Sequence, residues 1–281
     1  MTIAVLGSQG MLGRDCVEVL SQSHEVVPFS KTDLDITDSV AVHTVLSQIP
    51  DLDAVINCAA YTDVDGAESQ SDAAFLINET GPLNLATWCQ NHEVTLVHFS
   101  TDYVFDGTGT APYTEKDSVA PINRYGASKL AGEVAIRDTT DRHYIFRIQW
   151  LYGHHGDHFV KTMSTLLRTK PELSVVNDQM GALTWTRDVA VTLRRAIQTK
   201  IPYGTYHLAA TGYGSWFDVA RHIATISDLP IPIHPVPSTA FPRPAQRPHN
   251  SRLNCEKLWA TGIPKIPYWD ERLTEFLQPF E

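Results

Sequence analysis

Short apolar runs alternate with longer stretches of mixed polarity through the first half of the chain. Such runs, bounded by turn-forming residues, are typical of buried strands, and the longer stretches between them favour helices. The predicted strands cover residues 3–6, 25–29, 54–57, 95–99 and 143–147, and the predicted helices cover residues 11–21, 39–47, 72–91 and 125–137. This alternation predicts an α/β fold, a doubly wound parallel sheet of the Rossmann type with helices on both faces.

The second half of the chain has a less regular pattern. Its predicted elements are helices at residues 159–168, 187–198, 217–226 and 270–277 and a strand at residues 206–209. A proline-rich stretch over residues 229–248 is interpreted as an ordered, extended crossing. We therefore expect an NAD(P)-binding Rossmann domain over residues 1–150. A smaller α/β domain, mainly for substrate binding, is expected over residues 151–281, with some segments returning to the first domain.

The composition of the 281 residues is that of an ordinary globular protein, with 43% apolar and 19% charged residues. The net charge of -10 argues against nucleic-acid binding, which needs a basic face. No apolar run approaches the roughly 18 residues of a membrane span, and the N-terminus lacks the basic region of a signal peptide. Four separated cysteines suit free thiols in a reducing cytosol rather than a disulfide or zinc site. We therefore expect a cytoplasmic protein that binds neither nucleic acid nor membrane.

A glycine-rich turn joins the first predicted strand to the first predicted helix. Its sequence is Gly7-Ser-Gln-Gly10-Met11-Leu12-Gly13. Glycines at this spacing allow a tight turn and a close backbone approach, which places a pyrophosphate on the N-terminus of the helix. The strand–turn–helix context therefore predicts a dinucleotide-binding site formed by Gly7, Gly10, Met11, Leu12 and Gly13.

The residues after the second predicted strand bear on the choice of dinucleotide. An acidic residue there would bind a ribose 2′-hydroxyl and repel a 2′-phosphate. The chain has Ser30 and Lys31 instead, which favours NADPH. Asp33 and Asp35 follow within a few residues, so NADH remains an alternative.

A tyrosine and a lysine four residues apart, Tyr125 and Lys129, provide candidate catalytic chemistry. In a helix this spacing puts both side chains on one face. A buried ammonium favours the phenolate, so Lys129 is expected to lower the pKa of Tyr125 from about 10 toward working pH. A tyrosine with such a pKa can exchange a proton with an alcohol or an alkoxide. The glycine turn and Ser100-Thr101 upstream argue against a chance match.

Several longer motifs follow one another through nearly the whole chain. They are Gly7-x-x-Gly10-x-x-Gly13, Leu34-Asp-Ile-Thr-Asp38, Asn57-Cys-Ala-Ala-Tyr-Thr-Asp63, Ser100-Thr-Asp-Tyr-Val-Phe105, Tyr125-Gly-x-Ser-Lys129, Arg147-x-x-Trp150, Asn177-Asp-Gln-x-Gly-Ala182 and Arg247-Pro-His-Asn-Ser-Arg-Leu253. In these motifs the chain resembles the dTDP-4-dehydrorhamnose reductases, a family of extended short-chain dehydrogenases/reductases. The motifs at residues 100–105 and 247–253 are the most specific of the set.

The resemblance implies NADPH-dependent reduction of dTDP-4-dehydro-β-L-rhamnose to dTDP-β-L-rhamnose, the last step of dTDP-L-rhamnose biosynthesis. It assigns Tyr125 as the proton donor, Lys129 as its electrostatic partner and ribose ligand, and Thr101 as the hydroxyl on the substrate carbonyl. Arg247 is expected to bind the substrate diphosphate, with Arg243 or Arg252 as alternatives. The further residues that the resemblance implies are Asp35, Ile36, Ala59, Ala60 and Thr62 along the cofactor, and Asp102, Tyr103 and Trp150 at the nucleotide-sugar substrate.

Assembly, metal binding and the exact activity stay open at this point. Some members of the family dimerise through magnesium held by carboxylates. Asp15 could supply one carboxylate, but Arg187 stands where a glutamate is expected, so we expect a monomer or a different homodimer. His154, His155 and His158 are interpreted as part of a solvated loop, and no metal is predicted. A reductase or epimerase of another nucleotide-linked sugar and a non-catalytic NADP-binding regulatory subunit remain alternatives.

Overall fold

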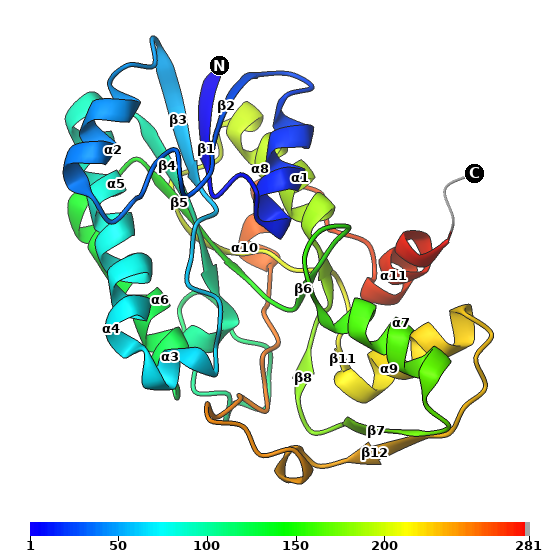
Figure 1. The fold of residues 1–281 in the computed structure, drawn as a ribbon. Helices are drawn as coiled ribbons and strands as arrows, with labels where there is room; N and C mark the ends of the chain where they lie inside the picture. The colour runs from blue at the N-terminus through cyan, green and yellow to red at the C-terminus, as the bar shows by residue number, and fades with distance from the viewer. Residues whose placement is uncertain (279–281) are drawn as a thin grey trace.

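A sheet of six parallel strands forms the centre of the computed structural model, which describes residues 1–278. Every neighbouring pair of strands in this sheet is parallel, which confirms the predicted doubly wound sheet. From one edge to the other the strands are β10 (Gly204–His207), β5 (His143–Ile148), β4 (Thr95–Thr101), β3 (Leu52–Asn57), β1 (Thr2–Leu6) and β2 (Glu25–Phe29) (Figure 1).

Helices cover both faces of the sheet. One face carries α2 (Ser39–Leu46), α5 (Gly81–His92) and α6 (Arg124–Thr139), and the other carries α1 (Met11–Leu20) and α8 (Thr186–Thr199) (Figure 1). Both α8 and β10 come from the second half of the chain, so later segments complete the sheet layer. The domain boundary near residue 150 stays a prediction.

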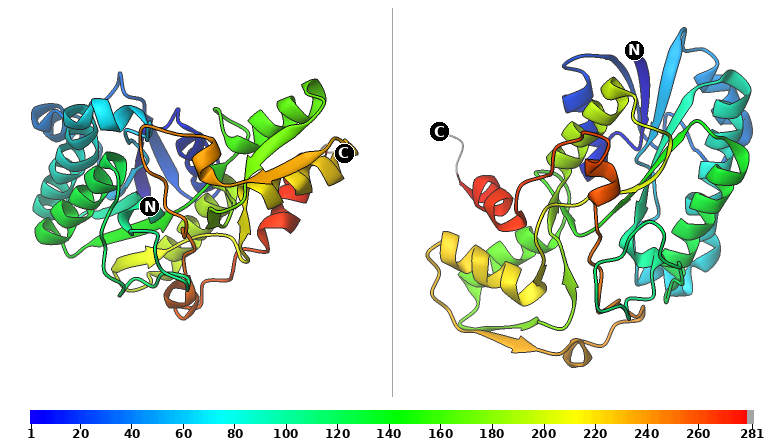
Figure 2. Two further views of the ribbon diagram at one scale, coloured as in Figure 1. Left: turned by 90° about the horizontal axis from the view of Figure 1, so that it is seen from below. Right: turned by 180° about the vertical axis from the view of Figure 1, so that it is seen from behind.

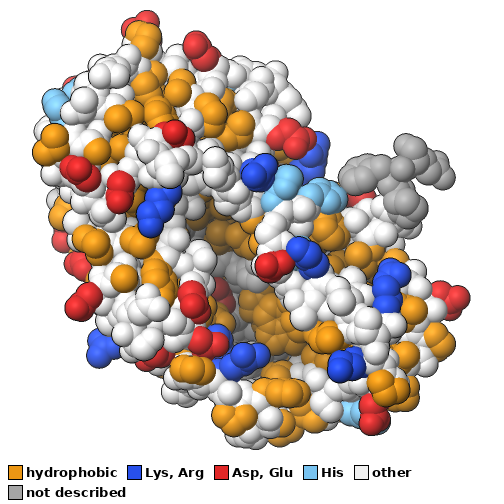
Figure 3. Space-filling view, viewed as in Figure 1, with side chains coloured by type: hydrophobic (Ala, Val, Ile, Leu, Met, Phe, Trp, Pro, Cys, Tyr) orange, Lys and Arg blue, Asp and Glu red, His pale blue; other side chains and the backbone are white. Residues whose placement is uncertain are grey.

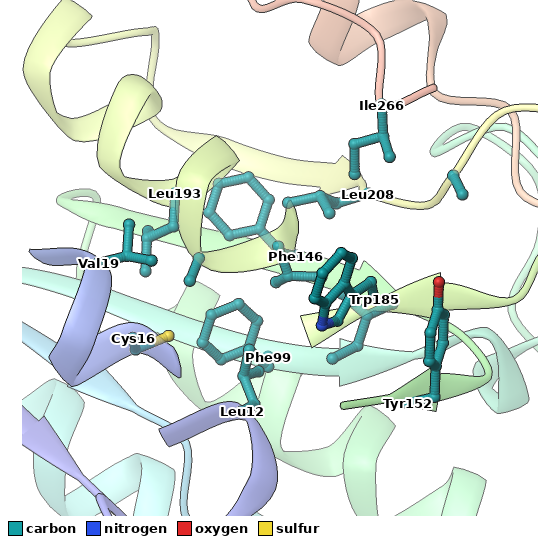
Figure 4. Close-up of a cluster of buried hydrophobic side chains, with 14 of the residues drawn as sticks. Leu12, Cys16, Val19, Phe99, Phe146, Tyr152, Trp185, Leu193, Leu208 and Ile266 are labelled. Carbon is teal, nitrogen blue, oxygen red and sulfur yellow. The ribbon is translucent and has the colours of Figure 1, made fainter. Parts of the chain in front are cut away.

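Two hydrophobic cores result, one on each face of the sheet. Successive side chains of a strand point to opposite faces. In β1, Ile3 and Val5 join the core beneath α1 and α8. Ala4 and Leu6 join the core beneath α2 and α5. Figure 4 shows part of the first core, which includes Leu12, Cys16, Val19, Phe99, Phe146, Trp185 and Leu193.

The helix predicted over residues 72–91 is interrupted in the structure. It consists of α4 (Ser71–Phe75), a π-helical turn η1 (Leu76–Thr80) and α5, and a short α3 (Gly66–Ser69) precedes it. π-helical turns of this kind often occur at functional sites. Here the turn carries the buried Asn78, whose side chain donates to the Ser128 hydroxyl of α6 at 2.9 Å.

The rest of the chain builds a smaller part beside the carboxyl edge of the sheet (Figures 1 and 2). Runs of two to four residues are too short to give a strand pattern in the sequence, so its small strand pairs are not predictable. The predicted helices are present, with ends that agree within one or two residues. The smaller part contains α7 (Phe159–Thr169), α9 (Trp216–Ile226) and α11 (Trp269–Leu277), and the strand pairs β6 (Leu151–Tyr152) with β9 (Thr184–Trp185), β7 (Leu173–Val176) with β12 (Ile233–Val236), and β8 (Met180–Gly181) with β11 (Gly214–Ser215).

The proline-rich stretch crosses from the smaller part back to the sheet, as predicted (Figure 2). It starts with β12, passes through the 3₁₀ turn η3 (Ser238–Ala240) and reaches the loop after β4, and α10 (Glu256–Trp259) follows. Asn250 lies just beyond the stretch. Its side chain donates to the carbonyls of Gly109 and Ala111, which belong to the loop after β4, each at 2.8 Å. Among residues 1–278, no helix is long and apolar enough to cross a membrane.

A buried ion pair joins α6 to the central strands. Glu133, whose side chain is 0% exposed, accepts hydrogen bonds from Arg147 of β5 at 2.8 and 2.9 Å. Ser100 of β4 and Arg137 also donate to it, at 2.5 and 2.9 Å. Burial by itself would raise the pKa of Glu133, but Arg147, Ser100 and Arg137 outweigh burial and hold the pKa below its usual value. The pair therefore fixes α6 against β4 and β5.

Removing one member of this pair should destabilise the fold more than removing both. Glu133→Met leaves the Arg147 guanidinium buried without its partner, for which we expect a loss of about 3–5 kcal/mol in the free energy of unfolding. The double variant Glu133→Met with Arg147→Met should recover about half of that loss or more, because no buried charge remains. Urea unfolding measures both values.

Asp157→Asn provides a matched control, because it breaks an exposed ion pair with Lys161. The control should leave the free energy of unfolding nearly unchanged, because water screens an exposed ion pair. Equal losses in the single and double Glu133 variants would contradict the assignment of this pair as a charge-balanced contact.

Candidate active site

The turn between β1 and α1 has the geometry of an anion-binding site. Gly7 has a φ of 69°, and a Cβ there would lie 2.7 Å from the Ala59 amide nitrogen, so a larger residue does not fit. A Cβ at Gly13 would overlap the Gly7 carbonyl oxygen. Gly10 is the N-cap of α1 and places no side chain on the first-turn N–H groups. These amides and the positive end of the helix dipole suit a pyrophosphate, so the predicted turn residues fit a dinucleotide.

The end of β2 lies where the adenosine ribose of a dinucleotide is expected. Ser30 donates its hydroxyl to Asp33 at 2.6 Å and its backbone N–H to the same oxygen at 2.8 Å. These bonds lower the pKa of the Asp33 carboxyl. The Asp33 carboxylate is therefore engaged by Ser30, and the neighbouring Lys31 is exposed. This arrangement suits a 2′-phosphate better than a bare 2′-hydroxyl.

Ile36 is placed differently from the expectation that it approaches the adenine. Its side chain is 3% exposed and belongs to the core beneath α2 and α5. Its carbonyl accepts a hydrogen bond from Asn84 at 3.0 Å. Asp35 is exposed and accepts the backbone N–H and the hydroxyl of Thr37 at 2.9 and 2.8 Å. A contact with adenine would therefore come from Asp35 and from the backbone of Ile36.

The loop after β3 forms the wall opposite the glycine turn. Ala59 and Ala60 are half-buried there, and the Ala59 backbone packs against Gly7. Thr62 is exposed, farther along the loop. Asn78 fixes the loop, because its side chain accepts from the Tyr61 N–H at 2.9 Å and donates to the Tyr61 carbonyl at 3.0 Å. Ala59 and Ala60 are therefore brought to the predicted cofactor cleft, whereas Thr62 lies at its exposed end.

The catalytic candidates meet where β4 ends and α6 begins. Thr101 is the last residue of β4, and Tyr125 lies in the first turn of α6. The helix begins there because Asn123 caps it, accepting the Gly126 N–H at 2.8 Å. The Thr101 hydroxyl donates to Asp102 at 2.9 Å, and it lies close enough to the Tyr125 phenol to affect the pKa of that phenol.

The expected lowering of the Tyr125 pKa is wrong for this structure. Burial raises the pKa of the Tyr125 phenol, and the negative charge of Asp102 raises it further. The Thr101 hydroxyl lowers it only in part. Tyr125 is therefore protonated at neutral pH, which is the form that can donate a proton.

Lys129 directs its amine to β4 and is only 2% exposed. Its Nζ donates to the Phe99 carbonyl at 2.6 Å and lies 3.2 Å from His98 Nε2. Burial lowers the pKa of Lys129 to about 8, although the charges of Glu133 and Cys58 act in the opposite direction. The sequence pattern did not single out His98. The sequence feature that could have pointed to His98 is its position as a polar residue between the apolar residues Val97 and Phe99 of β4.

Aromatic rings flank the catalytic candidates. The Tyr103 ring packs edge-on against Tyr125, with 5.9 Å between the ring centroids. Trp150 has a φ of 46°, which is rare for a bulky residue, and it stacks on Trp216 at 3.7 Å. Gly181 leaves room for the Trp150 ring, since a Cβ there would lie 2.6 Å from it. A strained backbone held in place by its surroundings is typical of functional positions.

A cavity of about 770 Å³ lies between the smaller part and the proline-rich stretch. Figure 3 shows a hollow on this face of the molecule. Its walls combine the rings of Phe159 and Trp216 with the side chains of Arg243 and Arg247. Arg247 is paired there with Asp65 at 3.0 Å. Aromatic faces and guanidinium groups are the chemistry that a nucleotide base and a diphosphate require.

The two most specific motifs of the sequence meet at Asp102. Asp102 is 3% exposed, and Ser251 of the returning segment lies close enough to its carboxyl to affect the pKa. The Asn123 side chain donates to the Gln246 carbonyl at 2.8 Å, which ties the start of α6 to the same returning segment. Burial raises the pKa of Asp102 to about 6, although Ser251 and the hydrogen bond from Thr101 act in the opposite direction.

Comparisons with known proteins agree with this arrangement. A family profile described as "RmlD substrate binding domain" matches residues 1–281. A dTDP-4-dehydrorhamnose reductase of Escherichia coli (strain K12) is 37% identical over 284 residues, covering 96% of this chain and 94% of that protein. A Streptomyces niveus protein named dTDP-4-keto-6-deoxy-D-glucose reductase is 38% identical over 274 residues, covering 96% and 94%. The structure of a dTDP-4-dehydrorhamnose reductase from Bacillus anthracis in complex with NADP is similar at 39% identity and a TM-score of 0.94, covering 98% of each chain. The chain belongs to the dTDP-4-dehydrorhamnose reductase family.

Membership in this family confirms the predicted family and the enzyme class, an NAD(P)H-dependent oxidoreductase. The roles of Thr101, Tyr125 and Lys129 stay predictions, as do those of the residues along the cofactor and the substrate. The structure brings Thr101, Tyr125 and Asp102 together, and Lys129 follows Tyr125 by one turn of α6.

The carboxylate expected for a magnesium bridge is not at the surface of this reductase. Asp15 is buried and accepts a hydrogen bond from the Thr186 hydroxyl, so it is not available as a surface ligand. Arg187 forms an ion pair with Glu18 of α1 at 2.7 Å. These contacts join α1 to α8 within one chain.

The loop after β6 that carries the histidines lies largely at the surface, with His154 exposed, and His154 and His158 each contact a neighbour. His154 stacks on Phe276 with 4.6 Å between the ring centroids. His158 caps α7, accepting the Lys161 N–H at 3.3 Å. Within residues 1–278, no group of three or more His, Cys, Asp or Glu residues is placed to hold a metal ion.

Asp102 should make the stability of the reductase fall as the pH rises. Its pKa of about 6 in the folded protein lies above the value of about 3.9 in an unfolded chain, so folding favours the protonated carboxyl. The contribution is fully present below about pH 4 and is lost as the pH rises through about 6, by on the order of 2–3 kcal/mol. Asp102→Asn removes this titration. Its free energy of unfolding, measured in urea, should therefore improve relative to wild type from about pH 4.5 to about pH 7.5.

Asp157→Asn again provides the control, because Asp157 is exposed. Its difference from wild type should stay nearly flat over the same pH range. A flat difference for Asp102→Asn as well would show that burial does not raise the pKa of this carboxyl.

Proposed function

We propose that the protein catalyses the NADPH-dependent reduction of dTDP-4-dehydro-β-L-rhamnose to dTDP-β-L-rhamnose, the last step of dTDP-L-rhamnose biosynthesis, with Tyr125 as the proton donor. The observation that carries the proposal is the meeting of Tyr125, Thr101 and Asp102 where β4 ends and α6 begins, near a cavity with arginine and aromatic walls. The name of the E. coli relative supports the substrate, and the NADP bound to the B. anthracis relative supports the cofactor.

Tyr125 holds the proton that the reduction requires. Reduction of a ketone leaves negative charge on its oxygen, and a positioned acid neutralises that charge. The raised pKa of Tyr125 keeps the phenol protonated at neutral pH. This proton can be given to a substrate oxygen that binds between the Tyr125 and Thr101 hydroxyls.

Thr101 and Lys129 stabilise negative charge before and after the proton is transferred. Bound NADPH supplies the hydride. The Thr101 hydroxyl polarises the carbonyl oxygen by donating to it in place of Asp102. Lys129, one helical turn after Tyr125, stabilises the phenolate that remains. With a pKa of about 8, most of its amine is charged at neutral pH.

The cavity accommodates the nucleotide end of the substrate. Phe159 and Trp216 offer ring faces to a base, and Arg243 and Arg247 offer guanidinium groups to the diphosphate. The Asp65 carboxylate holds Arg247 at this wall and would give up part of that contact when a diphosphate binds. The remaining donors of the Arg247 guanidinium allow it to contact both groups.

Reduction of a different 4-keto-6-deoxy sugar is the second candidate. The observation that favours it is the S. niveus relative, which is as similar to this chain as the E. coli relative but is named for another 4-keto sugar. The catalytic candidates Thr101, Tyr125 and Lys129 do not distinguish the two substrates, since the choice of substrate depends on the residues around the sugar. A regulatory role without catalysis is disfavoured by the intact set of Thr101, Tyr125, Lys129 and Arg247.

Purified protein should oxidise NADPH in the presence of dTDP-4-dehydro-β-L-rhamnose generated in place, and NMR should identify the product as dTDP-β-L-rhamnose. Tyr125→Phe should lower kcat roughly a hundredfold or more, because the proton donor is lost. The phenylalanine ring keeps the contact with Tyr103, so the fold should be retained, which circular dichroism checks.

The same assay distinguishes the proposed reaction from its alternatives. Turnover only with a 4-keto sugar of different configuration would make the second candidate the function. An altered sugar with unchanged NADPH would identify an epimerase. Tight NADPH binding with no turnover of either sugar would point to the regulatory reading.

Lys31→Glu should reverse the cofactor preference of the reductase. An acidic side chain at this position repels the 2′-phosphate of NADPH and can bind the 2′-hydroxyl of NADH. We expect kcat/KM for NADPH to fall roughly tenfold or more, with a change of less than about threefold for NADH. Lys161→Glu, at an exposed lysine of α7, serves as the charge-matched control and should leave the ratio unchanged. An unchanged ratio in Lys31→Glu would remove Lys31 from the NADPH site.

A further inference from the structure

A buried chain of polar side chains runs from β3 through β4 to α6. Asn57 and His98 are each 1% exposed, and His98 stands between Asn57 and Lys129. Asn57 Nδ2 lies 3.1 Å from His98 Nδ1, and His98 Nε2 lies 3.2 Å from Lys129 Nζ. At the two ends of the chain, Asn57 Oδ1 accepts the Ala59 N–H at 3.1 Å, and Lys129 donates to the Phe99 carbonyl at 2.6 Å. Both ring nitrogens of His98 are therefore in contact with a polar neighbour.

The His98 ring is neutral in this environment. Burial lowers the pKa of His98 well below its usual value, and the nearby charge of Lys129 lowers it further. A neutral imidazole has one N–H donor and one acceptor nitrogen. The ring must therefore donate to one of its two neighbours and accept from the other.

Two arrangements of hydrogens satisfy this requirement. In the first, Asn57 donates to Nδ1 of His98, and Nε2–H donates to Lys129 as a neutral amine. In the second, Lys129 is an ammonium and donates to Nε2, and Nδ1–H donates to the Asn57 oxygen after the amide has turned over, which gives up the hydrogen bond that this oxygen accepts from the Ala59 N–H. The charge of Lys129, the tautomer of His98 and the orientation of the Asn57 amide therefore change together.

We propose that His98 is a positioning residue of the reductase: its Nε2 holds the Lys129 amine beside the Phe99 carbonyl, and its tautomer follows the proton on that amine. The kinetic part of the proposal rests on the function proposed above, through the role given to Lys129. An acceptor at Nε2 favours the ammonium that stabilises a phenolate, whereas a donor there favours the neutral amine. Since the pKa of Lys129 is about 8, a small change at Nε2 alters how much of the amine is charged near neutral pH.

Other charged groups around Lys129 do not replace this contact. Glu133 reaches Lys129 from the same helix, but it is already paired with Arg147 and Arg137. Cys58 reaches it from the loop after β3. Glu133 favours the ammonium through its charge, and the hydrogen-bond contacts of the amine are with His98 and Phe99.

Nitrogen NMR of the free enzyme tests the tautomer directly, without substrate or cofactor. The ring nitrogens of His98 are assigned by their loss in His98→Gln and are followed as the pH rises. Protonation should move from Nδ1 to Nε2 as the pH passes through about 8, the pKa of Lys129. In Lys129→Met the tautomer should show no such change. A single tautomer throughout the wild-type titration would overturn the coupling.

Two conservative variants separate positioning from packing. The amide of His98→Gln reaches the place of Nε2 and can accept from Lys129, whereas the amide of His98→Asn reaches only the place of Nδ1. His98→Gln should keep kcat/KM within about threefold of wild type, and His98→Asn should lose about tenfold or more, because a hydrogen bond to a buried charge is removed. Thermal unfolding identifies any variant that fails to fold.

The pH profile of kcat/KM gives a readout that a packing role would not move. Activity should decline in wild type as Lys129 loses its proton near pH 8. This decline should shift to higher pH in His98→Gln, which always offers an acceptor, and to lower pH in His98→Asn, which offers none. Equal losses in the two variants with an unmoved profile would show that His98 only fills space. A tautomer change in a protein that reduces neither sugar would instead leave this inference standing and overturn the proposed function.

Discussion

Helix α6 is held on β4 by two charged side chains that lie one helical turn apart, and the geometry of the site depends on this contact. Lys129 reaches the Phe99 carbonyl, and Glu133 reaches Ser100 and Arg147. Buried charges are costly when they lose their partners, so neither contact can slip without a large penalty. The two contacts fix the rotation of α6 and its position along β4. The first turn of the helix, with its tyrosine, is thereby set beside the last residue of the strand before any substrate binds, which is the preorganisation that electrostatic catalysis requires.

The returning segment at residues 246–251 connects this fixed centre to the cavity. Gln246 accepts the hydrogen bond from Asn123, the residue that caps α6, and its neighbour Arg247 lines the cavity. Ser251 lies beside Asp102, at the end of β4. Through these contacts, a chain segment that follows the smaller part reaches both elements of the candidate site, β4 and α6. A ligand that binds the arginine wall therefore contacts the segment that also holds the cap of α6, which gives a physical path between the nucleotide end of a substrate and its reacting carbon.

Sequence reasoning predicted the parts of this structure that depend on local pattern. The parallel sheet follows from apolar runs and helix spacing, and the meeting of Thr101 with Tyr125 follows because both lie at the carboxyl edge of that sheet. The predictions that were wrong concern pKa values and side-chain exposure, which depend on burial in the folded protein. Lys129 was expected to act on Tyr125, but its amine is drawn to β4, and burial reverses the sign of the Tyr125 pKa shift. Tertiary burial also overturns two other expectations. Ile36, expected at the adenine, has its side chain in the core, and Asp15, expected as a surface carboxylate, is covered by α8. The π-helical turn that presents Asn78 has no periodic signature, because a single inserted residue shifts the helical pattern only locally.

Burial moves the three ionisable groups of the centre toward their neutral forms. It raises the pKa of Tyr125 and of Asp102 and lowers the pKa of Lys129. Such a site suits a reaction in which charge appears on a substrate oxygen and is immediately neutralised, since the proton is already on the phenol. It suits the opposite direction poorly, because oxidation of an alcohol needs the phenolate to remove a proton first. An epimerase that passes through a keto intermediate must run both directions on the same tyrosine, whereas a reductase needs only the first. Before a ligand binds, the raised pKa of Tyr125 thus keeps the phenol in the protonated form that the reducing direction uses.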